Sequence, residues 1–319
     1  MHIVILGAGA LGTVLGAHLA RAEEEVTLIA RGHRAAYLQE HGATLTGLAD
    51  FTVPVRVITD PSQVHDADVL IVTVKTYDMA SALESLKHLH VASVLSLQNG
   101  VLKNEQLAQT FGWEKVLGAT GILSAEVLPT GIVHFTANQG FYLGEVPEGT
   151  SARVQTLGDT LERVGIVVQV TPSIQAFEWA KYVGWVCLMV PAVLTRLESY
   201  KILQDAHTAF IMAAILHEMA QMATTQGIAL ADMAFFPTKT LSQLALDDLV
   251  THLRQMGDRW ASLLPTHKIS ALQDVERGKR LEVEETLGDA VRQSAALGVP
   301  TPTMDTCYKL IAGINHYLQ

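Results

Sequence analysis

The N-terminal stretch HIVILGAGALGTVLGAHLA constrains the fold more than any other part of this sequence. Its apolar residues 2–6 predict a strand, the glycines that follow predict a tight turn, and apolar residues at helical spacing come next. Glycines in these places permit the turn, let backbone amides approach a pyrophosphate, and let the helix pack closely on the strand. The motif therefore predicts a dinucleotide-binding unit; the alternative is a glycine turn made only for close packing. The residues expected at the dinucleotide are Gly7, Ala8, Gly9, Ala10, Leu11 and Gly12.

The residues after the second predicted strand, EVTLIA at 25–30, indicate which dinucleotide this unit binds. Proteins that bind NAD(H) usually carry an Asp or Glu at this point, which accepts hydrogen bonds from the ribose hydroxyls. This sequence has ARGHR instead, and the guanidinium of Arg31, with Arg34 nearby, suits a phosphate dianion. The pattern favours NADP(H) over NAD(H); the alternative is that Arg31 stacks on adenine or lies in solvent.

Strand and helix patterns alternate over the first half of the chain. Further strands are predicted at residues 69–75, 93–98, 115–120, 131–136, 140–145 and 165–170. Helices are predicted near residues 10–22, 78–88, 103–110 and 152–163. This alternation predicts a mostly parallel sheet with helices on both faces. Two of the strands flank Asn138, Gln139 and Gly140, and we expect them to form an antiparallel hairpin.

From Thr171 onward the strand signal stops and helical patterns take over. The expected fold class is α/β: an N-terminal Rossmann-type doubly wound sheet, residues 1–171, followed by an all-helical C-terminal domain, residues 172–319. A chain of 319 residues exceeds the usual size of one hydrophobic core, which agrees with two domains. The helices predicted in the second domain cover residues 173–196, 203–225, 239–256, 281–297 and 301–318.

Composition narrows the partners and the compartment. The 32 acidic residues outnumber the 22 basic ones and give a formal net charge of −10, so we expect no general attraction for nucleic acid or for an anionic membrane. Cys187 and Cys307 lie far apart in the sequence, and the N-terminus has no basic leader; both features favour a cytoplasmic protein with free thiols. The 13 histidines, such as His88 and His90, form no recognisable pairing with carboxylates or cysteines, so no metal site is expected.

One lysine stands at the edge of an apolar run in the second half, EWAKYVGWVCLMVP at 178–191. The residues from Val183 to Leu194 carry no charge, a stretch too short to cross a bilayer and typical of a buried helix. An ammonium group at this position has two interpretations. Lys181 either snorkels, with its stem on apolar surface and its head in water, or serves chemistry.

The chain resembles the ketopantoate reductase family along its whole length. The motifs that carry the resemblance are GAGALG at 7–12, Arg31, VTVKTYD at 72–78, LQNG at 97–100, EWAKYV at 178–183 and ISALQDVERGKRLEVEETLG at 269–288. The last block is the most specific, because it combines a serine, LQD, a basic RGKR and a glutamate at a defined spacing. The family reduces a 2-oxo acid, typically ketopantoate, to the 2-hydroxy acid with NADPH. The resemblance therefore implies this activity, NADP(H) as the cofactor and a small-molecule 2-oxo acid as the substrate.

The resemblance also implies roles for individual residues. Lys75 and Asn99 are expected at the cofactor and at the mouth of the active site. Lys181 is expected to protonate the new alkoxide, Ser270 to bind the substrate carboxylate, and Glu282 to orient Lys181 or the substrate hydroxyl. Chemistry independently favours these residue types, because hydride transfer to a ketone builds negative charge on the oxygen, which a nearby cation stabilises. The alternative for Glu282 is a solvated acid within an acidic run.

One departure from the family concerns the substrate. Family members that make pantoate usually carry asparagines one and two helical turns after the lysine, where this chain has Trp185 and Met189. We expect these two residues to form an apolar wall that disfavours the hydroxyl of ketopantoate; the alternative is that neighbouring residues restore polarity, since Pro191 could distort the helix. Two other functions stay open: a reductase of a bulkier branched or aromatic 2-oxo acid, and a non-catalytic NADPH-binding sensor. The oligomeric state stays open as well, a homodimer included.

Overall fold

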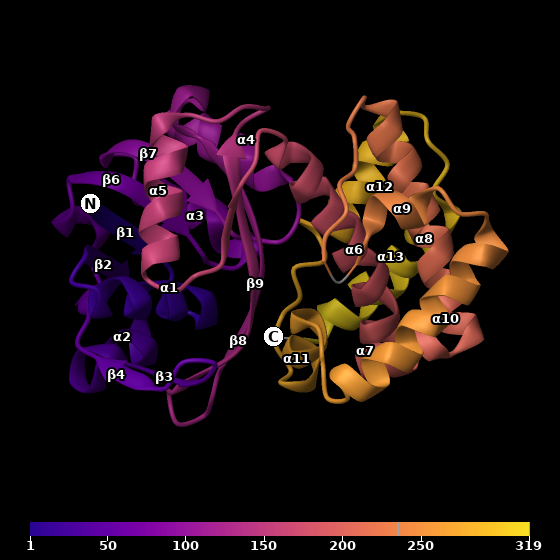
Figure 1. The fold of residues 1–319 in the computed structure, drawn as a ribbon, viewed down its shortest axis with the longest axis horizontal. Coiled ribbons are helices and arrows are strands. Elements are labelled where there is room, and N and C mark those ends of the chain that lie inside the picture. The colour runs from indigo at the N-terminus through magenta and orange to yellow at the C-terminus, as the bar shows by residue number, and fades with distance from the viewer. Residues whose placement is uncertain (235, 319) are drawn as a thin grey trace. The chain divides into compact units, whose positions relative to one another are not determined.

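Two compact units make up the chain, which a computed structural model describes over residues 1–234 and 236–318 (Figure 1). The first unit comprises Met1–Gln98 and Leu102–Glu178, and the second comprises Asn99–Val101 and Trp179–Gln319.

Strands and helices alternate in the first unit. Its strands are β1 (His2–Leu6), β2 (Glu25–Ile29), β3 (Ala43–Gly47), β4 (Phe51–Val53), β5 (Arg56–Ile58), β6 (Asp66–Val72), β7 (His90–Ser96), β8 (Leu117–Val127), β9 (Val133–Glu145) and β10 (Val168–Val170). Its α-helices are α1 (Ala10–Arg21), α2 (Gly32–His41), α3 (Met79–Glu84), α4 (Leu102–Phe111) and α5 (Ala152–Arg163). Short 3-10 helices are η1 (Pro61–Gln63), η2 (Thr76–Asp78) and η3 (Trp113–Lys115).

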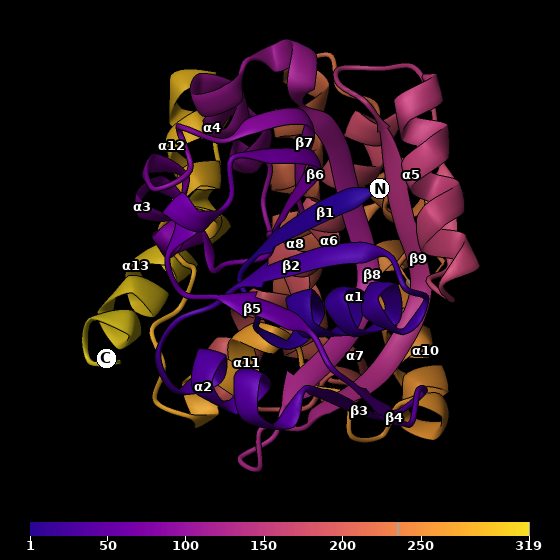
Figure 2. The same cartoon turned by 90° about the vertical axis from the view of Figure 1, so that its left-hand side faces the viewer.

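The N-terminal strand lies at the centre of a parallel sheet with the order β5-β2-β1-β6-β7 (Figure 2). Successive residues of a strand point to opposite faces of the sheet. Ile3 and Ile5 therefore join a core with α1 and α5, whereas Val4 and Leu6 pack with α3 and α4 on the opposite face. Because both faces are covered, the strands are apolar almost throughout, as is typical of parallel sheets. The predicted doubly wound sheet is confirmed.

A second sheet, absent from the sequence-based expectation, has the order β10-β9-β3-β4, with β8 antiparallel to β9. The expected hairpin around Asn138 is wrong, because β9 continues through this residue. The Asn138 side chain instead bonds neighbouring backbone: Nδ2 donates to the Gly165 carbonyl over 2.8 Å, and Oδ1 accepts from Val167 N over 3.0 Å. The chain reverses between β8 and β9, where Leu128 N donates to the Ile132 carbonyl over 2.8 Å.

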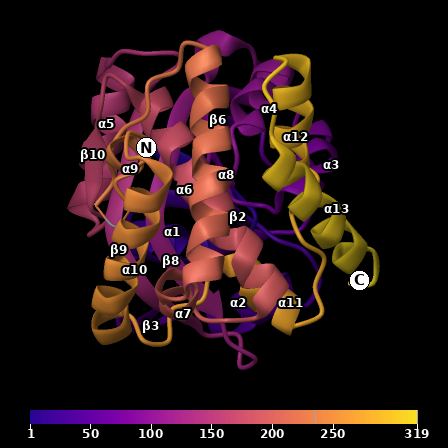
Figure 3. The same ribbon diagram turned by 90° about the vertical axis from the view of Figure 1, so that its right-hand side faces the viewer.

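Helices follow from the end of β10 onward. They are α6 (Ile174–Thr195), α7 (Ser199–Gln204), α8 (Ala206–Thr225), α9 (Thr238–Ser242), α10 (Leu246–Leu263), α11 (Ser270–Glu276), α12 (Leu287–Ala296) and α13 (Pro302–His316). Within the second unit α8 lies between α10 on one side and α12 with α13 on the other (Figure 3). The helical C-terminal part is therefore confirmed.

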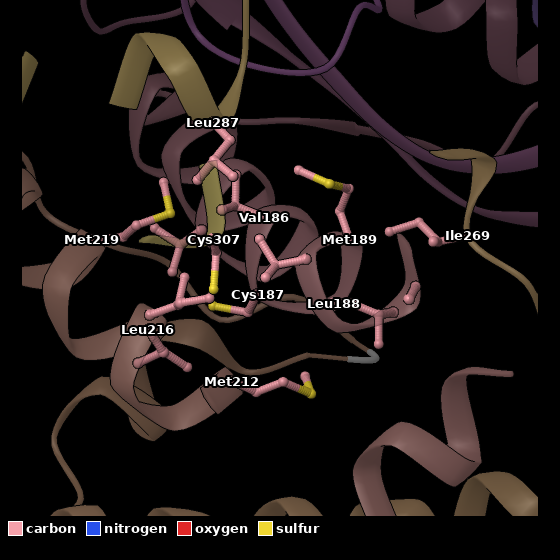
Figure 4. Close-up of a cluster of buried hydrophobic side chains, with 14 of the residues drawn as sticks. Val186, Cys187, Leu188, Met189, Met212, Leu216, Met219, Ile269, Leu287 and Cys307 are labelled. Carbon is pink, nitrogen blue, oxygen red and sulfur yellow. The ribbon is translucent and has the colours of Figure 1, made fainter. Parts of the chain in front are cut away.

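An apolar core holds the second unit together and encloses most of α6. Cys187 on α6 and Cys307 on α13 belong to this core, both as free thiols (Figure 4). Burial raises the pKa of the Cys187 thiol well above its usual range, so the group stays protonated. Among the residues that the structure describes, α6 is the one helix long and apolar enough to cross a membrane, but 72% of its most apolar window is buried inside the molecule. Burial of this extent is typical of a core helix.

Three of the helices predicted in the second half begin or end elsewhere. The helix expected at 239–256 is divided into α9, which ends at Ser242, and α10, which runs from Leu246 to Leu263. The helix expected at 203–225 is split at Asp205, whose carboxylate accepts hydrogen bonds from the first backbone N–H groups of α8. The helix expected from residue 281 begins only at Leu287. The preceding residues form a turn instead, in which Thr286 Oγ1 donates to the Glu282 carbonyl over 2.5 Å. We call the segment from Glu282 to Thr286 the Glu282 turn.

The expected domain boundary at residue 171 stays a prediction. The first turn of α6, up to Glu178, belongs to the first unit. There Phe177 stacks on Tyr142 of β9, with the ring centroids 4.6 Å apart. Long helices can thus start in one compact unit and continue into the next.

Candidate functional site

The glycine loop after β1 has the backbone geometry of a dinucleotide-binding turn. Gly7 lies at φ +104°, a conformation that favours glycine, and turns the chain from β1 into α1. A Cβ on Gly12 would lie 2.0 Å from the Gly7 carbonyl oxygen and 2.6 Å from Thr73 Oγ1, so α1 approaches the strand ends only because no side chain intervenes. A Cβ on Gly9, in contrast, would meet no described atom within 4 Å. The space over Gly9, at the N-terminus of α1, is therefore open to an anionic ligand.

The loop lies where the strand order of the parallel sheet reverses, between β1 and β6. Ligands of such sheets bind at the carboxyl ends of the strands, at this point of reversal. Arg31 follows β2 and is exposed at the N-cap of α2, while Lys75 follows β6 and is half-buried. Gln98, after β7, donates from Nε2 to the Val74 carbonyl over 2.9 Å and so links two strand ends. The glycine loop, Arg31 and Lys75 thus lie at one edge of one sheet.

Arg34 has a different position from the one expected beside a phosphate. Its Nε donates to the Ala8 carbonyl over 2.8 Å, and its Nη2 donates to Thr13 Oγ1 over 2.9 Å. Its Nη1 donates to the Gly131 carbonyl in the turn between β8 and β9, over 2.5 Å. Burial lowers the pKa of Arg34 from its usual value. Arg34 therefore stabilises the glycine loop and the start of α1 through these hydrogen bonds, and Arg31 is the exposed arginine of this segment.

The predicted catalytic lysine lies on α6 together with its two apolar successors. The helix continues through Pro191, so Lys181, Trp185 and Met189 follow one another at one-turn spacing on one face. Lys181 and Trp185 are half-buried. Met189, at 2% exposed, belongs to the core of the second unit, on the side of the cluster where Ile269 lies (Figure 4). Of the expected apolar wall, Trp185 is the part that remains accessible.

Glu282 is the buried member of its acidic run. Its residue exposure is 8%. Glu284 accepts a hydrogen bond from the Tyr308 hydroxyl over 2.8 Å, and Glu285 lies 3.7 Å from the Arg280 guanidinium. The Glu284 and Glu285 side chains are 42% and 23% exposed. The burial of Glu282 disagrees with the alternative of a solvated acid, because a buried carboxylate must be compensated by nearby groups.

A hydrogen bond joins the segments that carry Lys181 and Glu282. Tyr182, the residue after Lys181, donates its hydroxyl to the Thr286 carbonyl over 2.7 Å. Thr286 in turn donates its own hydroxyl to the Glu282 carbonyl. Two hydrogen bonds therefore link the segment that carries Lys181 to the segment that carries Glu282 within the second unit.

The loop of Asn99 packs on the same hydrogen-bonded residues. Gly100 lies at φ +85°, and a Cβ built on it would lie 3.6 Å from Thr286 Cγ2 and 4.0 Å from Tyr182 Cε2. Asn99 itself is half-buried. Ser270 is the first residue of α11 and is exposed, and the preceding Ile269 is anchored in the core of the second unit. All the residues expected at the substrate thus belong to the second unit, and those of the glycine loop, Arg31 and Lys75 belong to the first.

Sequence reasoning missed a buried ion pair in the first unit. Lys103 Nζ on α4 lies 2.6 Å from Glu178 Oε1, and their side chains are 2% and 3% exposed. Glu178 also accepts from Asn104 Nδ2 over 2.8 Å and from Ala119 N over 3.2 Å. The available signal was Glu178 itself, an acid one turn before Lys181 in an otherwise apolar segment. Within residues 1–234 and 236–318, no group of three or more His, Cys, Asp or Glu side chains is placed to hold a metal ion.

A parallel sheet with a glycine loop at its point of reversal, followed by a helical unit that holds a lysine and a buried glutamate, is typical of dinucleotide-dependent oxidoreductases. The chain belongs to the ketopantoate reductase family. The protein-family model described as "Ketopantoate reductase PanE/ApbA" matches residues 3–148, and the family model of its C-terminal part matches residues 173–315.

Curated and solved relatives cover the whole chain. The 2-dehydropantoate 2-reductase of Archaeoglobus fulgidus is 27% identical over 314 residues, 98% of each chain. The crystal structure of a PanE/ApbA family ketopantoate reductase from Ralstonia eutropha JMP134 has a TM-score of 0.84 at 27% identity and covers 99% of each chain. A ternary structure of D-mandelate dehydrogenase with NADH and anilino(oxo)acetate has a TM-score of 0.85 at 20% identity, covering 100% of this chain and 99% of that one. The last similarity shows a shared fold.

Proposed function

We propose that this chain reduces a 2-oxo acid to the corresponding 2-hydroxy acid with NADPH. Membership of the ketopantoate reductase family supports the reaction class. The observation that carries the proposal is the placement of the half-buried Lys181 and the 8% exposed Glu282 on segments joined through Tyr182 and Thr286. A cation that can donate a proton stabilises the negative charge that develops on the carbonyl oxygen during reduction, and a carboxylate can orient that cation.

The residues divide the reaction among them. The reduced nicotinamide, when bound, supplies a hydride to the carbonyl carbon. As the new C–H bond forms, the π electrons of the C=O bond move to oxygen, and Lys181 Nζ donates a proton to that oxygen. The 2-hydroxy acid leaves, and Lys181 regains a proton from solvent. Glu282, on the turn joined to α6 through Thr286 and Tyr182, orients Lys181 or the substrate hydroxyl. Ser270 Oγ, exposed at the start of α11, donates to the substrate carboxylate.

The cofactor assignment rests on Arg31. It is exposed after β2, no acid occupies that strand end, and Arg34 is engaged with Ala8, Thr13 and Gly131. Arg31→Ala should therefore raise the KM for NADPH much more than that for NADH. Arg34→Ala should raise both alike, because it loosens the loop that cradles the pyrophosphate. Equal effects of Arg31→Ala on both cofactors, or a wild type that prefers NADH, would refute the assignment.

Two substrate types compete, ketopantoate and a branched or aromatic 2-oxo acid. The accessible Trp185 favours the second, because its indole is mostly apolar surface and lacks the acceptor oxygen and the amide donors that an asparagine would offer to the hydroxyl of ketopantoate. A D-mandelate dehydrogenase with the same fold, in a ternary structure with NADH and anilino(oxo)acetate, supports an aromatic 2-oxo acid as a candidate.

A steady-state screen tests the proposal. Oxidation of NADPH is followed by its absorbance over a panel of 2-oxo acids that includes ketopantoate and branched and aromatic compounds. The proposal expects turnover with at least one of them. Tight binding of NADPH without turnover on any 2-oxo acid would instead support the non-catalytic sensor.

A further inference from the structure

We propose that Tyr182 is a positioning residue, which together with Thr286 sets the Glu282 turn against the helix that carries Lys181. The inference rests on the proposed function, because it concerns how that acid–base pair is held. Neither residue is required for the chemistry itself. Each acts through the backbone of a residue that is.

The Tyr182 hydroxyl and its acceptor are both buried. Tyr182 is 1% exposed and Thr286 is 0% exposed, so no bulk water competes for the 2.7 Å hydrogen bond between the hydroxyl and the Thr286 carbonyl. The ring is packed edge-on against Trp179 of the same helix, with centroids 5.9 Å apart. A buried hydroxyl without a partner would be costly, which makes this hydrogen bond specific to one position of the Glu282 turn.

Thr286 transmits that position to Glu282. Its carbonyl accepts hydrogen bonds from the Tyr182 hydroxyl and from Ala290 N. The second bond, over 2.9 Å, also forms the first turn of α12. Its hydroxyl donates to the Glu282 carbonyl over 2.5 Å and closes the turn. Two consecutive hydrogen bonds therefore run from the residue beside Lys181 to the backbone of Glu282.

Other contacts of this region lead elsewhere. Leu281 N donates to Asn315 Oδ1 over 2.7 Å, and Tyr308 on α13 donates to Glu284 over 2.8 Å. These contacts tie the segment to α13, whereas the Tyr182 bond ties it to α6. Tyr308 consequently offers a matched control, since Tyr308→Phe removes one hydroxyl bond from the same turn without changing its attachment to α6.

The experiment compares variants of the full-length chain with NADPH and the best 2-oxo acid of the panel. Tyr182→Phe and Thr286→Val should each lower kcat roughly tenfold, the size of one net hydrogen bond, while leaving the KM for NADPH unchanged. Thr286→Ser keeps both hydrogen bonds and should restore the wild-type kcat. Tyr308→Phe should keep the wild-type kcat. Thermal unfolding checks that every variant is folded.

A double-variant cycle separates positioning from loss of structure. If Tyr182 acts through Glu282, adding Tyr182→Phe to Glu282→Gln should cause no further loss in single-turnover rate. The positioning role would be overturned if the rate losses of the two single variants multiplied in the double variant, or if Tyr182→Phe kept the wild-type kcat. In either case a large loss of kcat in Lys181→Ala would still support the proposed reductase activity. A wild type inactive on every 2-oxo acid, or a fully active Lys181→Ala, would overturn the proposed function and the positioning role with it.

Discussion

Replacing Lys103, and so removing its buried ammonium group, should lower the unfolding free energy of the first unit more than replacing a charged residue on the surface. Its Nζ lies 2.6 Å from Glu178 Oε1, with the two side chains 2% and 3% exposed. In Lys103→Met the carboxylate of Glu178 keeps its two neutral donors, Asn104 Nδ2 and Ala119 N, but loses its only described cationic partner. A buried charge is thereby left uncompensated.

The expected cost follows from this burial. Breaking a buried ion pair by removing one partner costs about 3–5 kcal/mol of unfolding free energy, mostly as the penalty of the orphaned charge. For a unit of about 150–250 residues, each kcal/mol lowers Tm by about 2–4 °C, which gives a loss of about 6–20 °C. The double variant Lys103→Met with Glu178→Gln carries no buried charge, and its single amide oxygen keeps one of the two hydrogen bonds that Asn104 Nδ2 and Ala119 N make to the two oxygens of Glu178. We expect it to be more stable than Lys103→Met alone.

Thermal unfolding followed by circular dichroism measures these differences. Lys309→Met is the control, because Lys309 pairs with Asp305 over 2.7 Å but its side chain is 70% exposed, and such pairs contribute about 1 kcal/mol or less. A Tm for Lys103→Met equal to that of Lys309→Met would refute the reasoning. So would a double variant no more stable than the single one.

Three further predictions concern the glycine loop, a half-buried histidine and the substrate. Gly9→Ala should fold normally and bind NADPH more weakly, as measured by fluorescence titration. Gly12→Ala should instead lower Tm, since its Cβ would lie 2.0 Å from the Gly7 carbonyl oxygen. Equal losses of Tm in the two variants would contradict this prediction. Burial lowers the pKa of His267, so the unfolded chain takes up a proton at a higher pH than the folded chain does. The folded state therefore loses stability as the pH falls below about 6.5. Between about pH 7 and about pH 5, Tm should fall less in His267→Gln than in the wild type. Trp185→Asn should shift the ratio of kcat/KM values toward ketopantoate by roughly 10- to 100-fold, the equivalent of about 1–3 kcal/mol for a hydroxyl that regains a partner. An unchanged ratio would show that another polar group serves that hydroxyl.

The substrate test uses Trp185 alone because of what the structure adds to the sequence. Spacing placed Trp185 and Met189 on the face of Lys181, and the unbroken α6 agrees with that. Spacing could not show that Met189 is 2% exposed within the core, where an asparagine would bury an unpaired amide. The exposed fraction of a residue on a helix face depends on which other elements pack over it, and the local sequence does not encode this.

Local signals predicted the first sheet well and the second sheet poorly. The strand β1, the turn at Gly7 and the helix α1 follow from residues adjacent in sequence, so the glycine pattern suffices. The strand β9 reads locally as two strands around Asn138, because the bonds that keep this residue extended come from Gly165 and Val167, which are distant in sequence.

Site residues divide in the same way. Lys181 and Glu282 were predicted as site residues from the motifs of the family resemblance, and the structure adds the burial of Glu282. Arg34 reads as a phosphate ligand because of its charge, but long-range bonds to Ala8 and Gly131 engage it elsewhere. Tyr182 carried no local signal, because its role depends on Thr286, far along the chain.

The rate of hydride transfer in Lys181→Ala tests the central proposal most directly. With NADPH and the best 2-oxo acid of the panel, kcat should fall by about 10²- to 10⁴-fold, the usual contribution of general acid catalysis, while Tm and NADPH affinity stay near those of the wild type. A folded Lys181→Ala enzyme with near-normal kcat would contradict the proposal and leave Lys181 as a snorkelling lysine at the edge of a core helix.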